Sequence, residues 1–99
     1  MIKNGSRLKS QVDQTQIIVV RAAPSLVELR CGGAPMVDLD ADTATAELDP
    51  EFAGGTAVGK RYVNDDAAEV LVTKAGTGSL SIGRVALQVK EAKPLPASD

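Results

Sequence analysis

Apolar and polar residues alternate over short stretches of the chain, and glycine or proline separates these stretches. The block 17–20 is β-branched, and 26–31 alternates between an apolar and a polar face. The same two signals return at 70–73 and 79–82, with Gly76-Thr77-Gly78 between them as a hairpin turn. Because each stretch is too short for an amphipathic helix, the pattern predicts antiparallel strands with little helix.

The two ends of the chain repeat one order of signals. Residues 5–37 and 59–90 each open on a glycine and continue through a β-branched block, a turn and an alternating strand. Residues 38–58 form an acidic connector, and residues 91–99 a proline-containing tail. The similarity follows either from a tandem duplication or from the alternation that all β-hairpins share. We expect one all-β domain over residues 1–99, a small barrel or sandwich of two similar antiparallel β-hairpin units.

The chain is short and poor in aromatic residues. Its 99 residues suit one domain, and Tyr62 and Phe52 are its only aromatic side chains. The core must therefore be aliphatic and light. A light core leaves room for an interface to add stability, so we expect a protein partner or a homo-oligomer.

The charge balance excludes some classes of partner. A net charge of -2 and a pI near 5.0 argue against nucleic acid, which requires a basic surface and often aromatic side chains. No apolar run approaches the ~20 residues of a membrane span, and no signal-peptide segment follows the basic start. One cysteine permits no internal disulfide, as is usual in a reducing compartment. We expect a cytoplasmic protein that binds neither nucleic acid nor membrane.

Three aspartates at alternate positions raise the hypothesis of a calcium loop. Asp38, Asp40 and Asp42 have the spacing of the first EF-hand ligands. An EF-hand also requires glycine at position six and glutamate at position twelve, where this chain has Thr43 and Asp49. The sequence therefore favours a solvated acidic connector over a calcium site.

No set of residues has the composition of a catalytic centre. Cys31 shares the inward face of its predicted strand with Val27 and Leu29, which favours a buried thiol. The chain has no histidine to activate a cysteine or serine nucleophile. Asp65-Asp66 lies in a predicted tight turn, and Gly76-Thr77-Gly78 lies between strands, where no helix N-terminus can bind phosphate. We expect no catalytic and no cofactor-binding residue.

Residues 29–36, Leu-Arg-Cys-Gly-Gly-Ala-Pro-Met, resemble the Leu-x-Cys-Cys-Gly-x-x-Met motif of desulforedoxin and of the desulforedoxin-like domain of desulfoferrodoxin. Gly5 matches the opening glycine of that family and 17–20 its strand. Ser10-Gln11-Val12-Asp13 occupies the place of its Cys-x-x-Cys. The resemblance implies a rubredoxin-type metal-ribbon fold. The whole chain also resembles small bacterial proteins of actinobacterial type, which implies no function.

In the desulforedoxin family four thiolates hold one iron or zinc. Ser10, Asp13 and Arg30 stand in three of those places here, and only Cys31 remains. The resemblance thus implies the fold with its metal ligands lost, and we expect no cofactor. An alternative keeps a metal between two chains, each contributing Cys31 with Asp13 completing the shell.

The leading functional hypothesis is a non-catalytic binding or accessory module, such as the small subunit of an enzyme complex. The alternative is a small metal or redox protein with an intersubunit site at Cys31. Prolines stiffen the tail and lower the entropy lost on docking, whereas most chain ends are simply frayed. If the tail docks, the partner-binding residues are Lys90, Lys93, Pro94, Leu95 and Pro96.

Overall fold

Short strands make up most of the ordered structure. The computed structural model describes residues 2–43 and 46–90. The first half contains β1 (Arg7–Lys9), β2 (Gln16–Arg21), β3 (Leu29–Cys31), β4 (Ala34–Pro35) and β5 (Val37–Asp38). The second half contains β6 (Arg61–Val63), β7 (Glu69–Lys74), β8 (Leu80–Ile82), β9 (Val85–Ala86) and β10 (Gln88–Val89). Two 3-10 helices, η1 (Pro24–Glu28) and η2 (Pro50–Phe52), are the only helical turns in the described ranges.

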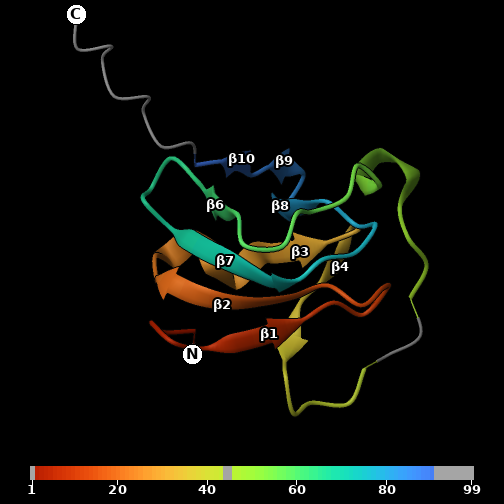
Figure 1. Ribbon diagram of the computed structural model, residues 1–99, viewed down its shortest axis with the longest axis horizontal. Coiled ribbons are helices and arrows are strands. Elements are labelled where there is room, and N and C mark those ends of the chain that lie inside the picture. Colours follow the sequence, from red (N-terminus) through yellow and green to blue (C-terminus); the bar gives the residue numbers. More distant parts are fainter. Residues whose placement is uncertain (1, 44–45, 91–99) are drawn as a thin grey trace, which may run out of the picture.

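The strands form two antiparallel sheets packed face to face. The six-stranded sheet has the order β10-β6-β7-β2-β1-β5, and the four-stranded sheet has the order β4-β3-β8-β9. In the view of Figure 1, β2 and β7 lie in front of β3. Neither sheet closes on itself within the described residues. The predicted all-β fold is therefore confirmed as a sandwich, and its alternative, a barrel, is wrong.

The two halves use the same internal pairings. In the first half β1 pairs with β2 and β5, and β3 pairs with β4. In the second half β6 pairs with β7 and β10, and β8 pairs with β9. The antiparallel pairs β2–β7 and β3–β8 then join the halves, one in each sheet. Each sheet thus contains strands from both halves of the chain.

The segment 26–31 corrects one prediction. Its first part belongs to η1 rather than to a strand, because Pro24 begins the helix with the φ angle that a helical turn requires. Leu26 is consequently buried, while Val27 is 81% exposed instead of facing inward. The strand begins only at Leu29, after which the predicted alternation holds and Cys31 is fully buried.

The core between the sheets is aliphatic, as the composition predicts. Leu8, Ile17, Val19, Val70 and Val72 project from the six-stranded sheet onto Leu29, Cys31 and Leu80 of the four-stranded sheet. Burying such a side chain contributes ~1.5–3 kcal/mol, so the alternating strands supply much of the stability. Tyr62 is the aromatic member of this cluster, and its hydroxyl accepts a hydrogen bond from the Ala57 amide at 3.1 Å.

The connector is fastened to the four-stranded sheet at η2. The Asp49 carboxylate accepts a hydrogen bond from the Glu51 amide at 2.9 Å and so caps this helix. Arg84 forms an ion pair with Glu51 and places its guanidinium 5.4 Å from the ring centre of buried Phe52. No helix formed by the described residues is long and apolar enough to span a membrane.

Candidate functional site

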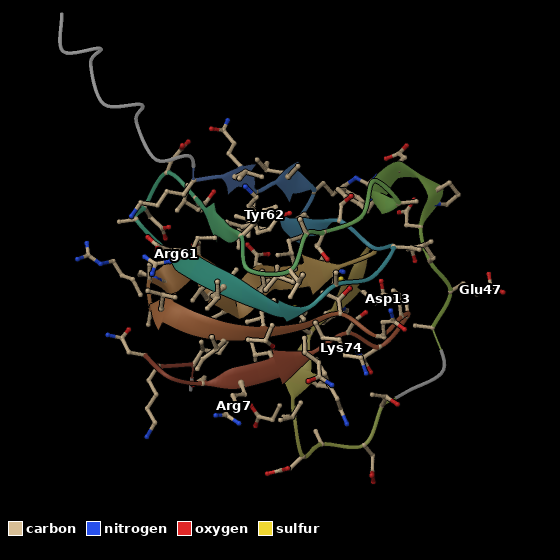
Figure 2. The ribbon with its side chains drawn as sticks, viewed as in Figure 1. Arg7, Asp13, Glu47, Arg61, Tyr62 and Lys74 are labelled. Carbon is tan, nitrogen blue, oxygen red and sulfur yellow. The ribbon has the colours of Figure 1, made fainter. Side chains whose placement is uncertain are left out.

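The turn between β1 and β2 meets Cys31 in the structure. Asp13 lies in this turn (Figure 2), and its Oδ1 is 3.9 Å from Cys31 Sγ. Ser10 and Thr15 close the turn through a backbone hydrogen bond of 2.9 Å, and both are buried. The structure thus brings together three of the residues that the desulforedoxin resemblance places at ligand positions, Ser10, Asp13 and Cys31.

Hydrogen bonds occupy both Asp13 oxygens. Oδ1 accepts from the Thr15 amide at 3.1 Å, and Oδ2 accepts from the Thr15 hydroxyl at 3.0 Å and the Gly78 amide at 2.6 Å. Ser10 Oγ accepts from the Asp13 amide at 3.2 Å. Since Gly78 belongs to the connection between β7 and β8, this carboxylate links the two halves of the chain.

Glycine permits this close approach of the two segments. A Cβ atom on Gly78 would lie 2.9 Å from the Gly32 nitrogen and 3.0 Å from Cys31 Sγ. Real Cβ atoms are rarely so close to backbone, so any other residue would push the β7–β8 connection away from Cys31. The predicted hairpin turn at Gly76-Thr77-Gly78 is therefore wrong: β7 and β8 lie in different sheets, and these residues form a close-packed connection between the sheets that requires glycine at Gly78.

The pKa values of the two acidic groups of this cluster, Cys31 and Asp13, are shifted in opposite directions. Burial raises the pKa of the Cys31 thiol to about 11, well above its usual value. Burial alone would also raise the pKa of Asp13, but hydrogen bonds from the Gly78 amide and from Ser10 and Thr15 outweigh it and lower that pKa. At neutral pH the cluster therefore pairs a protonated thiol with an ionised carboxylate, which is not a nucleophilic arrangement.

The residues do not fit the iron or zinc that the desulforedoxin resemblance implies. A tetrahedral site needs four donors aimed at one point. Arg30 donates instead to the Gly33 carbonyl at 3.1 Å, and the Asp13 oxygens are committed to the backbone and to Thr15. Among residues 2–43 and 46–90, no three acidic, histidine or cysteine side chains are arranged to hold a metal ion. The intersubunit alternative also requires a reachable thiol, whereas Cys31 has 0% exposure.

Asp66 repeats the arrangement of Asp13 in the second half. Its Oδ1 accepts from the Ala68 amide at 3.2 Å, two residues ahead, and its Oδ2 accepts from the Ser25 amide at 3.1 Å. Hydrogen bonding from Ser25 is the largest effect, and it lowers the pKa of Asp66. The turn at Asp65-Asp66 therefore has a structural role across the halves that its sequence does not reveal.

The aspartates with calcium-loop spacing do not converge. Asp38 ends β5, and Asp38, Asp40 and Asp42 are all exposed. Asp49, at position twelve of the motif, caps η2 and lies 4.0 Å from Arg84. These carboxylates are engaged in turns and caps or face solvent.

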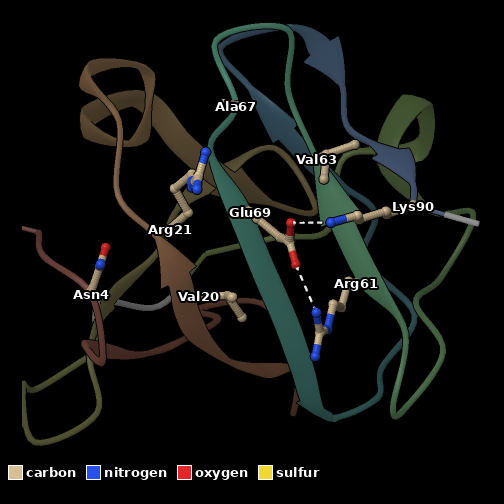
Figure 3. A pocket seen from close by; sticks show the side chains of 8 residues that line it. All are labelled: Asn4, Val20, Arg21, Arg61, Val63, Ala67, Glu69 and Lys90. Atoms are coloured by element: carbon tan, nitrogen blue, oxygen red, sulfur yellow. Dashed lines mark hydrogen bonds and ion pairs between the residues drawn. The ribbon is translucent and has the colours of Figure 1, made fainter. Parts of the chain in front are cut away.

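A pocket of about 530 Å³ surrounds Glu69 at one end of β7 (Figure 3). The Glu69 side chain is 10% exposed, and its carboxylate accepts hydrogen bonds from Lys90 Nζ at 3.0 Å and Arg61 Nη1 at 3.3 Å. The hydrogen bond from Lys90 is the main cause of the lowered pKa of Glu69. Arg21 lines the same pocket and lies opposite Glu69 in the strand register. Three cations therefore surround one carboxylate, which leaves a local excess of positive charge.

The outer face of the six-stranded sheet carries a row of cross-strand neighbours. Arg7 lies opposite Ile18, Ile18 opposite Leu71, and Leu71 opposite Arg61. Both arginines are exposed, and they alternate with buried Leu8 and Tyr62 on their own strands. Their Cα atoms are ~14 Å apart, since neighbouring strands are ~4.8 Å apart. We call this surface the cationic face.

The cationic face has three parts. The row from Arg7 to Arg61 forms its centre, the Glu69 pocket lies on one side of this row, and Gln16 lies on the opposite side. Gln16 lies opposite Lys9 on β1 and opposite Lys74 on β7. A second pocket, of about 230 Å³, adjoins Gln16 and is lined also by Arg7, Ile18, Leu39 and Thr73. The face thus has an apolar centre, flanking cations and a pocket at each end.

Sequence reasoning missed the cationic face because its residues converge only through the β2–β7 register. One signal was available, the arginine that follows glycine by two residues in each half, at Arg7 and Arg61. Of the predicted tail residues, Lys90 is described and is bound to Glu69. Lys93, Pro94, Leu95 and Pro96 lie outside the described residues.

Comparisons with known proteins add no relative. None of the protein-family models, curated proteins or solved structures compared with the chain matches it.

Proposed function

We propose that the protein is a non-catalytic binding module that holds an acidic polypeptide segment of a partner protein on its cationic face. The observation that carries the proposal is the row of Arg7, Ile18, Leu71 and Arg61 across the centre of the six-stranded sheet. Guanidinium groups bind carboxylates with two parallel hydrogen bonds, and Ile18 and Leu71 offer apolar contact between them. The row therefore combines charge with a small hydrophobic centre, as binding surfaces do.

The distribution of charge supports an acidic ligand. The whole chain has a net charge of -2, yet the cationic face carries one carboxylate, Glu69, among the described residues. Complementary charge steers such a ligand to this face and raises the association rate. The cations of the face are Arg7, Lys9, Arg21, Arg61, Lys74 and Lys90.

The side chains of the face favour a polypeptide over a nucleic acid. Single-stranded nucleic acids bind sheet surfaces largely by stacking bases on exposed aromatic rings. The chain has two aromatic residues, and both are buried. Tyr62 lies in the core on the other face of this sheet, and Phe52 belongs to η2. The face therefore offers contacts to phosphate but no aromatic ring on which a base can stack. An acidic peptide, in contrast, can contact both the cations and the apolar centre of the face.

The metal or redox alternative at Cys31 has less support. Its thiol is fully buried and its pKa is raised to about 11, so it is neither reachable by a second chain nor ionised at neutral pH. If the protein is the small subunit of an enzyme complex, the large subunit of that complex is the partner that carries the acidic segment.

We also propose that the halves 5–37 and 59–90 descend from a tandem duplication. Equivalent residues make equivalent backbone hydrogen bonds, which alternation alone does not require. The matched bonds are Gly5 N to Val19 O (2.8 Å) with Gly59 N to Val72 O (2.9 Å), and Gly32 N to Ser79 O with Gly83 N to Glu28 O (both 2.9 Å).

Fluorescence anisotropy tests the proposed function. The probe is a labelled extended peptide in which glutamate and leucine take turns at every second position, with threonine between them, so that both lie on one face. It is titrated with the full chain at low and physiological salt. We expect saturable binding that weakens as salt rises, and at least a tenfold loss of affinity in the double variant Arg7→Ala, Arg61→Ala. Arg84→Ala is the charge-matched control, because Arg84 lies by the four-stranded sheet and pairs with Glu51. Equal loss in the control and the double variant would contradict the proposal.

A further inference from the structure

The two pockets of the cationic face occupy the same place in the two halves. Arg61 in one corresponds to Arg7 in the other, since the Lys90 amide donates to the Arg61 carbonyl at 2.7 Å and the Leu39 amide to the Arg7 carbonyl at 3.0 Å. Glu69 lies opposite Val63, and Gln16 opposite Lys9, in the matching ladders. By this correspondence Glu69 matches Gln16 and Lys90 matches Leu39.

The pockets differ in chemistry although they match in position. In the first, the Glu69 side chain is 10% exposed and pairs with Lys90 and Arg61, which are each 54% exposed, and Arg21 adds a third cation to the lining. In the second, the residues that match Glu69 and Lys90 are Gln16 and Leu39. Ile17 and Ile18 also line this pocket, and among the described residues Arg7, the match of Arg61, is its one charged lining residue. The first pocket, with three cations and one carboxylate, favours an anionic group, whereas the second offers Ile17, Ile18 and Leu39 to an apolar side chain.

We infer that the cationic face selects a peptide that carries one anionic group and one apolar side chain at a fixed separation. The Glu69 pocket takes the anionic group on Arg21 and Arg61, and the Leu39 pocket takes the apolar side chain. This inference rests on the proposed function and names the ligand for the same face. From Glu69 to Thr73 is ~13 Å along β7, and one or two strand spacings separate the pockets sideways. The two groups therefore lie about four residues apart in an extended ligand, an even separation that keeps both on one face.

A charge-swap between the pockets provides the test. The double variant Gln16→Glu, Leu39→Lys gives the second pocket the ion pair of the first. The reciprocal double variant Arg21→Leu, Lys90→Leu replaces two of the three cations of the first pocket with apolar side chains and leaves Arg61 paired with Glu69. Circular dichroism and thermal melting establish that each variant is folded, and either one is sufficient if the other does not fold.

Three extended peptides of equal length serve as probes, with glutamate and leucine, two glutamates, or two leucines placed four residues apart on a common backbone, so that both groups lie on one face. We expect wild type to prefer the mixed peptide about tenfold. The Gln16→Glu, Leu39→Lys variant should shift its preference to the peptide with two glutamates, and the reciprocal variant to the peptide with two leucines.

The outcomes separate the two proposals. If neither folded swap variant changes the ranking of the peptides, while Arg7→Ala, Arg61→Ala still weakens all of them, the pocket assignment is wrong and the proposed function stands. If wild type binds none of the peptides, or binds a single-stranded oligonucleotide more tightly, both proposals are wrong. Two preferences that move in opposite directions in the two variants would establish the inference.

Discussion

Asp13 and Asp66 make the same kind of link in the two halves of the chain. Each carboxylate accepts a hydrogen bond from the backbone amide two residues ahead and another from an amide in the opposite half, Gly78 for Asp13 and Ser25 for Asp66. Charge-assisted bonds of this kind are stronger than neutral ones. The pair therefore fastens the halves together outside the strand ladders.

Replacing Asp13 tests this link. We expect Asp13→Asn to lower the free energy of unfolding by roughly 1–2 kcal/mol, because the amide loses the charge that strengthens its bonds to Gly78 and Thr15. Asp66→Asn should have a smaller effect, since Asp66 is exposed. Urea unfolding measures both, and exposed Asp42→Asn is the control. Equal stability of Asp13→Asn and the control would show that the link is not stabilising.

Acid should weaken the fold through the same carboxylates. The folded-state pKa values of Asp13, Asp66 and Glu69 are lowered, so the unfolded state binds more protons as the pH falls below about 4–5. The stability they contribute is complete above the unfolded pKa values and is lost as the pH falls through the folded ones. Melting temperatures between pH 7 and pH 2 measure this loss. Asp13→Asn should show a shallower decline than wild type, and a parallel decline would contradict the assignment for Asp13.

The Cys31 thiol should be inert in the folded protein. Its pKa of about 11 and its complete burial leave almost no accessible thiolate at neutral pH. We expect a thiol-specific disulfide reagent to react only as fast as the chain unfolds, and rapidly in urea. Stoichiometric reaction within seconds in native buffer would mean that the thiol is exposed.

Gly78 should tolerate no side chain. Because its Cβ would approach the Gly32 backbone and Cys31 Sγ, we expect Gly78→Ala to cost about 1–3 kcal/mol. Gly54→Ala is the matched control, since the nearest atom there is the Ser79 hydroxyl alone, at 3.0 Å. Urea unfolding of the two variants gives the comparison, and similar midpoints would contradict the close packing of the β7–β8 connection.

Local pattern was sufficient for part of the fold. The β-branched block 17–20 and the block 70–73 form the central strands β2 and β7, and Cys31 lies in the core, because burial on alternate positions is a local property. The pattern failed at Val27, where Pro24 starts a helical turn and changes the period. A strand alternation that begins two residues after a proline is therefore unreliable, because the proline can start a helical turn.

The candidate site depended on contacts between distant segments. Arg21 meets Glu69 only through the antiparallel pairing of β2 with β7, and Lys90 reaches Glu69 from β10. The spacing of residues along the sequence does not reveal the register between β2 and β7. The repeated arginine at Arg7 and Arg61 was the one visible sign, and it becomes meaningful only when the halves are superimposed through their hydrogen bonds.

The most direct test of the central claim is to map binding on the protein by NMR. Amide shifts of the isotopically labelled full chain are followed while the unlabelled glutamate–leucine peptide is added. The largest changes should fall in β1, β2, β6 and β7, with Ile18 and Leu71 at their centre and the four-stranded sheet little affected. Changes centred on β3, β4, β8 and β9, or spread evenly over the chain, would contradict the cationic face as the binding surface.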